Sequence, residues 1–241
     1  PEDGLTLVGI LGIRDEVRPE AIEAIAEVQD AGVQIVMITG DRRETAVAIA
    51  KDAGLLQRPN ELVWTSAELA EMSDEQVKLE LHKLRVVARA LPMDKSRLVR
   101  LAQEMNLVVG MTGDGVNDSP ALKKADVGFA MGSGTEVAKE AGDIVILDDN
   151  FLSIKQAILY GRTIYNSICK FIVFQLTINF SAVAINFIAP FIGIDKPLTI
   201  TQILWINLVM DTLAALAFGG EPALEKYLSL IHISEPTRRR G

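Results

Sequence analysis

The chain has 241 residues, with 24 basic and 32 acidic side chains and a formal net charge of −8. Its composition, 49% hydrophobic and 23% charged, is typical of a folded globular protein and excludes a disordered or collagen-like chain. The negative charge argues against nucleic acid as a partner, because that binding depends on basic surface. A single cysteine excludes an internal disulfide scaffold. The chain opens with Pro-Glu-Asp-Gly and no leader peptide, so we expect it to be part of a longer protein.

The first 148 residues alternate short apolar runs with helical patterns. Strands are expected at residues 5–13, 33–38, 62–65, 85–88, 107–111, 127–130 and 144–147. Helices are expected at 19–31, 44–53, 73–84 and 94–105, with a shorter helical piece after Ser66. Strands that alternate with helices pair in parallel through right-handed crossovers. The pattern therefore predicts an α/β fold with a doubly wound parallel sheet.

Two long apolar stretches follow. A helix that starts near Asp149 is expected to run directly into residues 171–194, which carry no charged side chain. At ~1.5 Å rise per residue, that stretch can cross a hydrocarbon core of ~30 Å. Residues 200–218 carry a single charge, and the short segment 195–199 joins the two stretches. We therefore expect a transmembrane helical hairpin; the alternative is a pair of buried core helices.

The charges that flank the hairpin indicate its orientation. Arg162 and Lys170 precede the first apolar stretch, whereas the connecting loop has no net charge. By the positive-inside rule, residues 1–170 are expected in the cytoplasm and the loop 195–199 outside.

Two similar loops follow predicted strands, Thr39-Gly40-Asp41 and Thr112-Gly113-Asp114. A hydroxyl, a glycine that permits close backbone approach and a carboxylate suit a phosphoryl group and a magnesium ion. The second loop adds Asn117 and Asp118, and acidic groups this close repel one another unless a cation neutralises them. The alternative is an ordinary solvated turn that caps the next helix.

Lys95 lies at the start of a predicted helix, after an Ala-Leu-Pro turn. A basic side chain there opposes the helix dipole, so a local structural reason for it is weak. A point charge that binds phosphate explains it better; the alternative is a surface lysine.

The apolar stretches contain polar side chains that could bind a cation. Asn207 and Asp211 are four residues apart and share one helix face, and Asn179 lies in the middle of the first stretch. A carboxylate in a membrane span is costly and indicates function. Carboxylate and amide oxygens are ligands for a hard cation such as calcium; the alternative is an Asn–Asp pair that joins two helices.

Four segments closely resemble motifs of the P-type ATPases. They are residues 111–126 (Met-Thr-Gly-Asp-Gly-Val-Asn-Asp-Ser-Pro-Ala-Leu-Lys-Lys-Ala-Asp), 37–41, 88–95 and 130–135. They occur in the family's order, and the resemblance covers residues 4 to 228. It implies a haloacid-dehalogenase-like Rossmannoid sheet and ATP-driven ion transport through an aspartyl phosphate, with Mg²⁺ and ATP as cofactors. The family's acceptor motif, Asp-Lys-Thr-Gly-Thr, does not occur here, so the acceptor is expected outside this chain.

The resemblance also implies a division of the chain. It gives residues 1–148 as the C-terminal part of the phosphorylation domain, 149–170 as a stalk helix, and 171–194 and 200–219 as the fifth and sixth transmembrane helices. The sheet would thus be partial, and residues 220–241 would form a cytoplasmic tail. The segment 229–241 resembles nothing in the family and is expected to be a truncated or foreign end.

Residue roles follow from positions in the motifs. The resemblance implies Asp114 and Asp118, supported by Asn117, for magnesium; Thr39, Gly40 and Lys95 for the phosphoryl group; and Asp41 and Arg89 for the nucleotide.

The transported ion is indicated by the apolar stretches. Residues 204–212 resemble calcium pumps, and residues 174–179 followed by Ala182 are similar to plasma-membrane-type calcium ATPases. Two-ion pumps have a glutamate at the position of Ala182, so a single calcium ion is expected. Its implied ligands here are Asn179, Asn207 and Asp211, with further oxygens from helices outside this chain.

The implied partners are the lipid bilayer, ATP, the calcium ion and the remaining domains of the same pump, in the plasma or inner membrane. Other readings are a pump for sodium or magnesium, a membrane-tethered haloacid-dehalogenase-like phosphatase, and a non-catalytic fragment.

Overall fold

The computed structural model describes residue 8 and residues 16–194, 197–224 and 227–228. The chain divides into two compact units, one of residues 1–26 and 34–149 and the other of residues 27–33 and 150–241. The predicted strand at 5–13, apart from Val8, and the segment 229–241 lie outside the described residues.

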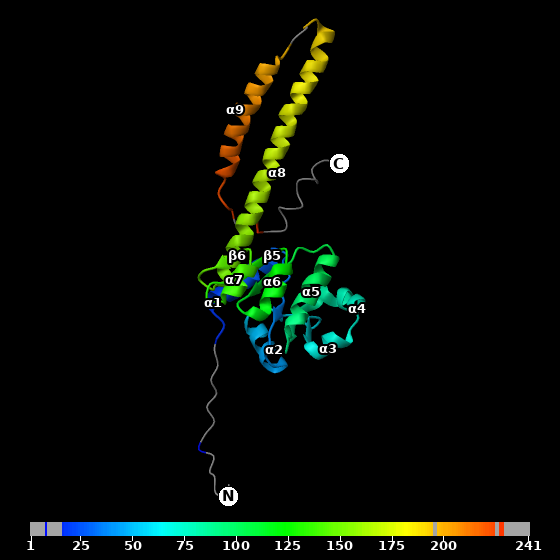
Figure 1. The fold of residues 1–241 in the computed structure, drawn as a ribbon, viewed down its shortest axis with the longest axis vertical. Coiled ribbons are helices and arrows are strands. Elements are labelled where there is room, and N and C mark those ends of the chain that lie inside the picture. Colours follow the sequence, from blue (N-terminus) through cyan, green and yellow to red (C-terminus); the bar gives the residue numbers. More distant parts are fainter. Residues whose placement is uncertain (1–7, 9–15, 195–196, 225–226, 229–241) are drawn as a thin grey trace. The chain divides into compact units, whose positions relative to one another are not determined.

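The first unit alternates strands and helices along the chain (Figure 1). Its strands are β1 (Met37–Ile38), β2 (Leu62–Thr65), β3 (Leu84–Ala88), β4 (Gly110–Gly113), β5 (Val127–Met131) and β6 (Ile144–Ile146). Its helices are α2 (Arg43–Asp52), α3 (Ser66–Glu71), α4 (Asp74–Glu80), α5 (Pro92–Glu104), α6 (Ser119–Lys124) and α7 (Glu136–Ala141). Short 3₁₀ turns lie at Leu81–Lys83 and Val116–Asp118. Helix α1 (Pro19–Asp30) crosses from the first unit into the second.

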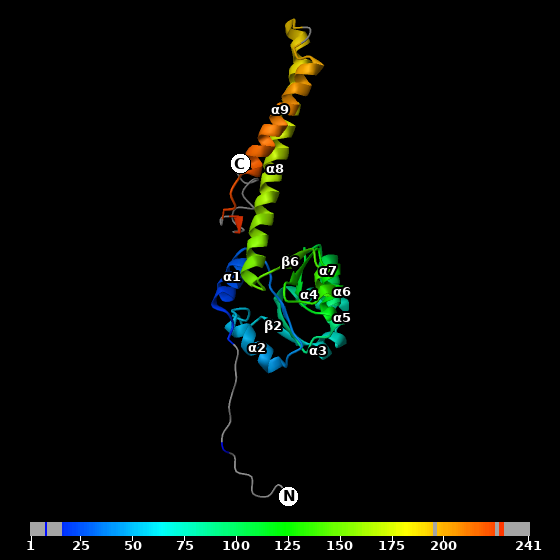
Figure 2. The same cartoon turned by 60° about the vertical axis from the view of Figure 1, so that its left-hand side comes forward.

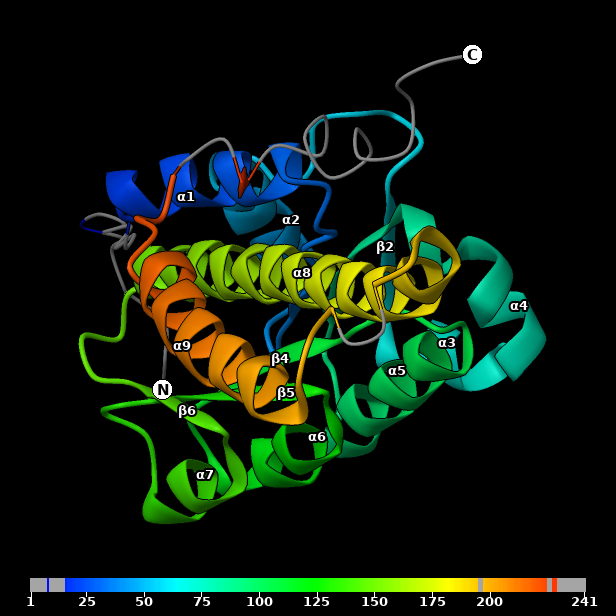
Figure 3. The same ribbon diagram turned by 90° about the horizontal axis from the view of Figure 1, so that it is seen from above.

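All the strand pairs in the described residues are parallel, as the sequence predicts. They form two three-stranded sheets, β1-β3-β2 and β4-β5-β6, rather than one sheet. The second of these is seen from above in Figure 3. Strands β1 and β4 are each the outer strand of their sheet. Thr39-Gly40-Asp41 follows β1, whereas β4 extends beyond the predicted end at residue 111 to include Thr112 and Gly113, so that only Asp114 of the second sequence lies after the strand.

Two strands begin later than expected, and in both places side chains bond to backbone groups next to the strand. Within the run 33–38 only β1 pairs with β3, whereas upstream the Gln34 amide donates to Leu81 O (2.7 Å) and Leu84 O (2.8 Å). Strand β4 begins at Gly110 instead of residue 107, and the N–H of Val109 donates to the Asp126 carboxylate (2.8 Å).

Each sheet has its own apolar core. Residues of β2, β3 and helices α3, α4 and α5 form the first, which contains Trp64, Leu69, Val77, Leu81, Leu84, Val87, Leu98 and Leu101. The second joins α5, β4, α6 and α7 through Val99, Met111, Ala121, Leu122 and Ala138. Helix α5 contributes to both cores, so it connects the two sheets and holds its N-terminus near them.

The second unit is dominated by two long helices, α8 (Phe151–Ile188) and α9 (Ile200–Gly219). Helix α8 runs through Lys170 without a break and continues as a 3₁₀ turn at Ala189–Ile192. The two helices lie side by side and antiparallel (Figures 1 and 2). Lys170 pairs with Glu221 (2.6 Å), and the rings of Phe174 and Phe218 are 6.0 Å apart. Within the described residues these two helices are long and apolar enough to cross a membrane.

Candidate functional site

An ion pair connects the first turn of α5 to the second Thr-Gly-Asp loop. The Lys95 ammonium donates to Asp118 Oδ1 at 2.5 Å. Both side chains are largely buried, with 19% and 9% of their surfaces exposed. The other oxygen of Asp118 accepts from the N–H groups of Asp114 (3.3 Å) and Gly115 (3.4 Å). Asp118 therefore fixes both the lysine and the backbone of the loop.

These contacts determine the charge of Asp118. Burial opposes ionisation, but the hydrogen bond and charge of Lys95, together with the two backbone N–H groups, outweigh it and hold the pKa of Asp118 below its usual value. The backbone at Gly113 lies so close that a Cβ there would be 2.4 Å from the Cβ of Asp118. The loop therefore requires glycine at that position.

Asp114 has a different environment. Its residue is exposed, and its carboxylate makes no hydrogen bond or ion pair within the part of the chain that the structure describes. Its backbone is held by the loop after β5, because Thr135 N–H donates to Asp114 O (2.8 Å).

Of the side chains in this loop, the Asp114 carboxylate suits a magnesium ion. Asp114 offers an unengaged carboxylate, and Mg²⁺ is usually held by one or two carboxylates together with phosphate oxygens and water. The oxygens of Asp118 are already bound to Lys95 and to backbone N–H groups. Asn117 is exposed beside them in the 3₁₀ turn. No group of three or more His, Cys, Asp or Glu side chains able to hold a metal is found among the described residues.

The first Thr-Gly-Asp loop is joined to the segment after β3. Thr39 N–H donates to Val87 O, and Thr39 O accepts from Ala90 N–H, both at 2.9 Å. Arg89 N–H donates to Asp41 O at 2.9 Å, and Arg89 has a left-handed backbone with φ of 50°. The Thr39 hydroxyl donates to Asp41 Oδ2 at 3.0 Å. Gly40 is exposed, and a Cβ there would meet nothing within 4 Å.

The structure thus brings the predicted residues into two groups. Lys95, Asp118 and the Asp114 backbone are in direct contact. Thr39, Asp41 and Arg89 form a second network. Hydrogen bonds within the described chain do not join the two groups.

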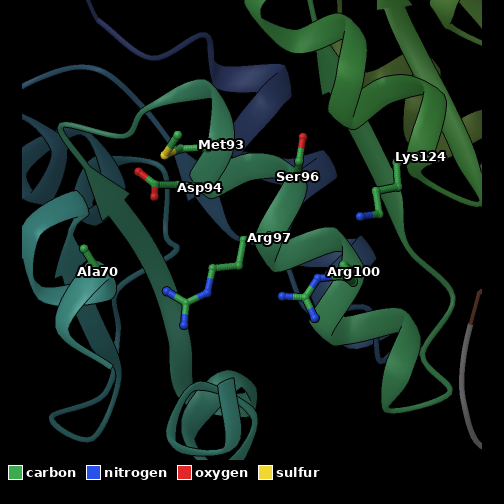
Figure 4. A pocket seen from close by; sticks show the side chains of 7 residues that line it. All are labelled: Ala70, Met93, Asp94, Ser96, Arg97, Arg100 and Lys124. Carbon is green, nitrogen blue, oxygen red and sulfur yellow. The ribbon is translucent and has the colours of Figure 1, made fainter. Parts of the chain in front are cut away.

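The cavity shown in Figure 4 lies elsewhere on α5. It has a volume of about 410 Å³ and is lined by Ala70, Met93, Asp94, Ser96, Arg97, Arg100 and Lys124. Both arginines there are already bound: Arg97 donates to Asp74 and to two backbone carbonyls, and Arg100 donates to Asp74 and Glu104. Because both guanidinium groups are already bound to carboxylate or carbonyl oxygens, we assign no anion site to this cavity.

Two side-chain contacts of α8 with α9 and the residues just after it set the register of these helices and so the positions of their polar residues. Lys170 faces Glu221, and Phe174 faces Phe218. In an antiparallel pair this register puts Asp211 opposite the turn of α8 that contains Asn179. Asp211 and Asn207 are half-buried, whereas Asn179 is exposed.

Sequence reasoning missed several residues in this arrangement. Gln175 Oε1 is a buried side-chain oxygen without a hydrogen-bond partner in the described chain, as is Oδ1 of Asp211, which the sequence does predict. Gln175 carries a sequence signal, since it is polar within an apolar stretch. Gly134 lies in the motif segment 130–135, but its packing on Asp114 and the hydrogen bonds between Asp149 and Ser133 join distant segments and have no local sequence signal.

Profiles of known protein families match most of the chain. The sequence profile of the haloacid dehalogenase-like hydrolase family matches residues 2–126, and a second profile with that description matches residues 97–158. The profile "Cation transporting ATPase, C-terminus" matches residues 195–230.

Individual calcium-transporting ATPases are also similar to this chain. Plasma membrane calcium-transporting ATPase 1 of Mus musculus is 48% identical over 240 residues, with 93% of this chain and 20% of that protein covered. Calcium-transporting ATPase 12, plasma membrane-type, of Arabidopsis thaliana is 49% identical over 225 residues, with coverages of 91% and 22%. The chain thus spans about a fifth of the length of these relatives.

A solved structure shares the fold. The crystal structure of a zinc-transporting PIB-type ATPase in the E2.Pi state superposes with a TM-score of 0.58 at 29% identity, over 85% of this chain and 27% of the other. The chain belongs to the haloacid dehalogenase-like hydrolase family, and over nearly its whole length it is similar to plasma-membrane-type calcium-transporting ATPases.

Proposed function

We propose that this chain is part of an ATP-driven calcium-transporting P-type ATPase that works through an aspartyl phosphate whose acceptor lies outside the chain. The observation that carries the proposal is Asp211. A carboxylate with a buried, unpartnered oxygen lies within an apolar helix, in the same chain as the Lys95–Asp118 loop system. Its similarity to plasma-membrane-type calcium ATPases supports calcium as the ion.

The cytoplasmic residues would divide the work of phosphoryl transfer. Lys95, oriented by Asp118, offers positive charge to the phosphoryl group. The backbone at exposed Gly40 would offer a hydrogen bond, and the Thr39 hydroxyl would offer another by turning from Asp41 to the phosphoryl group. Asp114 is the magnesium ligand with free oxygens, while Asp118 and Asn117 support its loop. When bound there, magnesium would neutralise charge on phosphoryl oxygens. Asp41 and Arg89 lie in the loop pair that would meet the nucleotide.

In the membrane, Asn179, Asn207 and Asp211 would supply oxygens to one calcium ion. Calcium prefers 6–8 oxygen ligands, so the remaining ligands must come from other helices of the pump. Residues 149–170 would form the cytoplasmic stalk, with 171–194 and 200–219 spanning the plasma membrane.

The test uses the full-length pump and the variant Asp114→Asn. Removing one charge from the magnesium ligand should lower the rate of phosphoenzyme formation from labelled ATP by about 100-fold, as expected for loss of a group that stabilises transferred charge. Glu136→Gln, which removes an exposed carboxylate on nearby α7, is the matched control and should phosphorylate normally. Normal phosphorylation of Asp114→Asn would contradict the assignment.

A further inference from the structure

We propose that residues 131–135, here called the strap, connect the backbone of Asp114 to Asp149, and that Asp149 is a positioning residue that couples the phosphoryl site to helix α8. This inference rests on the proposed function and adds to it a residue and a physical link.

One end of the strap packs directly on Asp114. A Cβ at Gly134 would lie 2.7 Å from Asp114 O and 3.0 Å from Asp114 Cα, so the two backbones touch without a side chain between them. The next residue, Thr135, donates its N–H to Asp114 O at 2.8 Å and also caps α7. A shift of the Asp114 backbone therefore requires the strap to move with it.

The other end of the strap is held by Asp149. Ser133 N–H donates to both carboxylate oxygens of Asp149, at 3.1 Å and 3.3 Å. Hydrogen bonds from the side chain and backbone of Ser133 keep the pKa of Asp149 below its usual range, so the acceptor is charged at neutral pH. Gly132 N–H donates to Ile146 O (2.8 Å), and a Cβ at Gly132 would collide with that carbonyl.

Asp149 has an unusual backbone for a residue with a side chain. Its φ of 49° is left-handed, a conformation that is uncommon for residues other than glycine and that aspartate adopts more often than most. The hydrogen bonds from Ser133 N–H to its carboxylate help to hold it there. Glycine would accept this backbone without strain, which makes a clean test possible.

Asp149 is separated from α8 by one residue. Asn150 caps that helix, its side chain accepting from Leu152 N–H at 3.0 Å, and the helix begins at Phe151. The same helix carries Asn179. A displacement at Asp114 can therefore reach the helix that enters the membrane through the strap, Asp149 and the two peptide bonds that flank Asn150, which is a contiguous physical route.

The experiment compares Asp149→Gly with Asp149→Asn in the full-length pump. Asp149→Gly keeps the left-handed backbone and removes both acceptors, whereas Asp149→Asn keeps one acceptor oxygen. Asn106→Gly is the matched control, because Asn106 is also left-handed (φ 59°) but lies away from the strap, after α5. Two quantities are measured: calcium transported per ATP, and hydrogen exchange of peptides 150–160 on addition of Mg²⁺ and ATP.

We expect Asp149→Gly to form the phosphoenzyme at a rate within about twofold of wild type while calcium transported per ATP falls about fivefold or more, the low end of typical allosteric coupling. The Mg²⁺–ATP effect on exchange in peptides 150–160 should disappear. In both measurements Asp149→Asn should give values between those of Asp149→Gly and wild type, and Asn106→Gly should match wild type.

Unchanged coupling and exchange in Asp149→Gly would overturn the inference, and so would loss of its phosphoenzyme, since Asp149 would then only build the site. If wild-type phosphorylation ignores calcium, the proposed function fails. The exchange measurement would still decide the role of the strap.

Discussion

At the scale of single residues, Asp118 shows how one carboxylate can serve several partners. It neutralises Lys95 and accepts two backbone N–H groups, all in a largely buried position. A buried ion pair is strongly destabilising when one member is removed, because the other charge is left unpaired.

We therefore predict that Asp118→Asn lowers the free energy of unfolding of the first unit by about 3 kcal/mol at pH 7. The folded-state pKa of Asp118 is depressed, so its stabilisation is present above the unfolded pKa, about 3.9, and is lost as pH falls through the folded pKa. The difference between wild type and Asp118→Asn should narrow below pH about 4.

The measurement is denaturant unfolding of the whole chain in detergent, followed by Trp64 fluorescence in a Trp205→Phe background. Trp64 is buried in the first core, whereas Trp205 is an exposed residue of α9. As a control, Lys95→Met combined with Asp118→Asn should cost less than the sum of the two single changes. A difference that stays constant from pH 7 to pH 3 would contradict the prediction.

At the scale of secondary-structure elements, helix α8 depends on a side chain that reaches two distant carbonyl groups. Arg162 donates to Ala31 O, just past the end of α1, at 2.9 Å, and to Leu228 O at 2.8 Å. Ala31, Leu159, Tyr227 and Leu228 form the apolar cluster beside it. The arginine therefore ties three separate chain segments of the second unit together.

We predict that Arg162→Ala lowers the free energy of unfolding of the second unit by about 3 kcal/mol, because hydrogen bonds to a charged group contribute about 1.5–3 kcal/mol each. Arg162→Lys should recover less than half, since an ammonium lacks the planar fork that serves both carbonyls. Trp205 fluorescence in a Trp64→Phe background reports the transition. Equal stability of the lysine variant and wild type would show that charge alone is needed.

The elements also show what sequence patterns can predict. Strand β2 lies where its apolar run predicts, and α8 continues through Lys170 as its uninterrupted helical pattern indicates. Strand β4 does not begin at Leu107, because the Asp126 side chain occupies the N–H of Val109, a contact between segments 17 residues apart. Such boundaries are set by tertiary hydrogen bonds that no local pattern contains.

In the candidate site too, some residues could be predicted from the sequence and others depend on tertiary contacts. Thr-Gly-Asp spacing identifies Asp114 and Asp118, because carboxylates that dense beside a strand end need a counter-charge. The identity of that counter-charge, Lys95, follows only once α5 is packed against both sheets. The roles of Gly134 and Asp149 require the strap to be folded, so they were not predictable from sequence.

At the scale of the whole molecule, the residues proposed for phosphoryl chemistry and those proposed for ion binding lie in different units of one chain. The ion-binding part is incomplete by itself, because the two helices offer one carboxylate and a few amide oxygens, whereas calcium prefers 6–8 oxygens. Ala182 provides no oxygen where two-ion pumps have a carboxylate, which favours a single ion.

We predict that the full-length protein forms its phosphoenzyme in a calcium-dependent manner, with one calcium ion bound per phosphoenzyme. Asp211→Asn should remove that dependence by weakening calcium binding about 100-fold or more, because a charged ligand is lost from an apolar site. Thr212→Val is the matched control, since the Thr212 hydroxyl is exposed and already donates to Leu208 O at 2.7 Å. Calcium titration of phosphorylation from labelled ATP, together with equilibrium binding of radioactive calcium, measures both quantities.

Phosphorylation indifferent to calcium would contradict the choice of ion, whereas two bound ions would contradict only the argument from Ala182. Ala182→Glu is not expected to add a second ion, because a new carboxylate binds calcium only where neighbouring helices complete the oxygen shell.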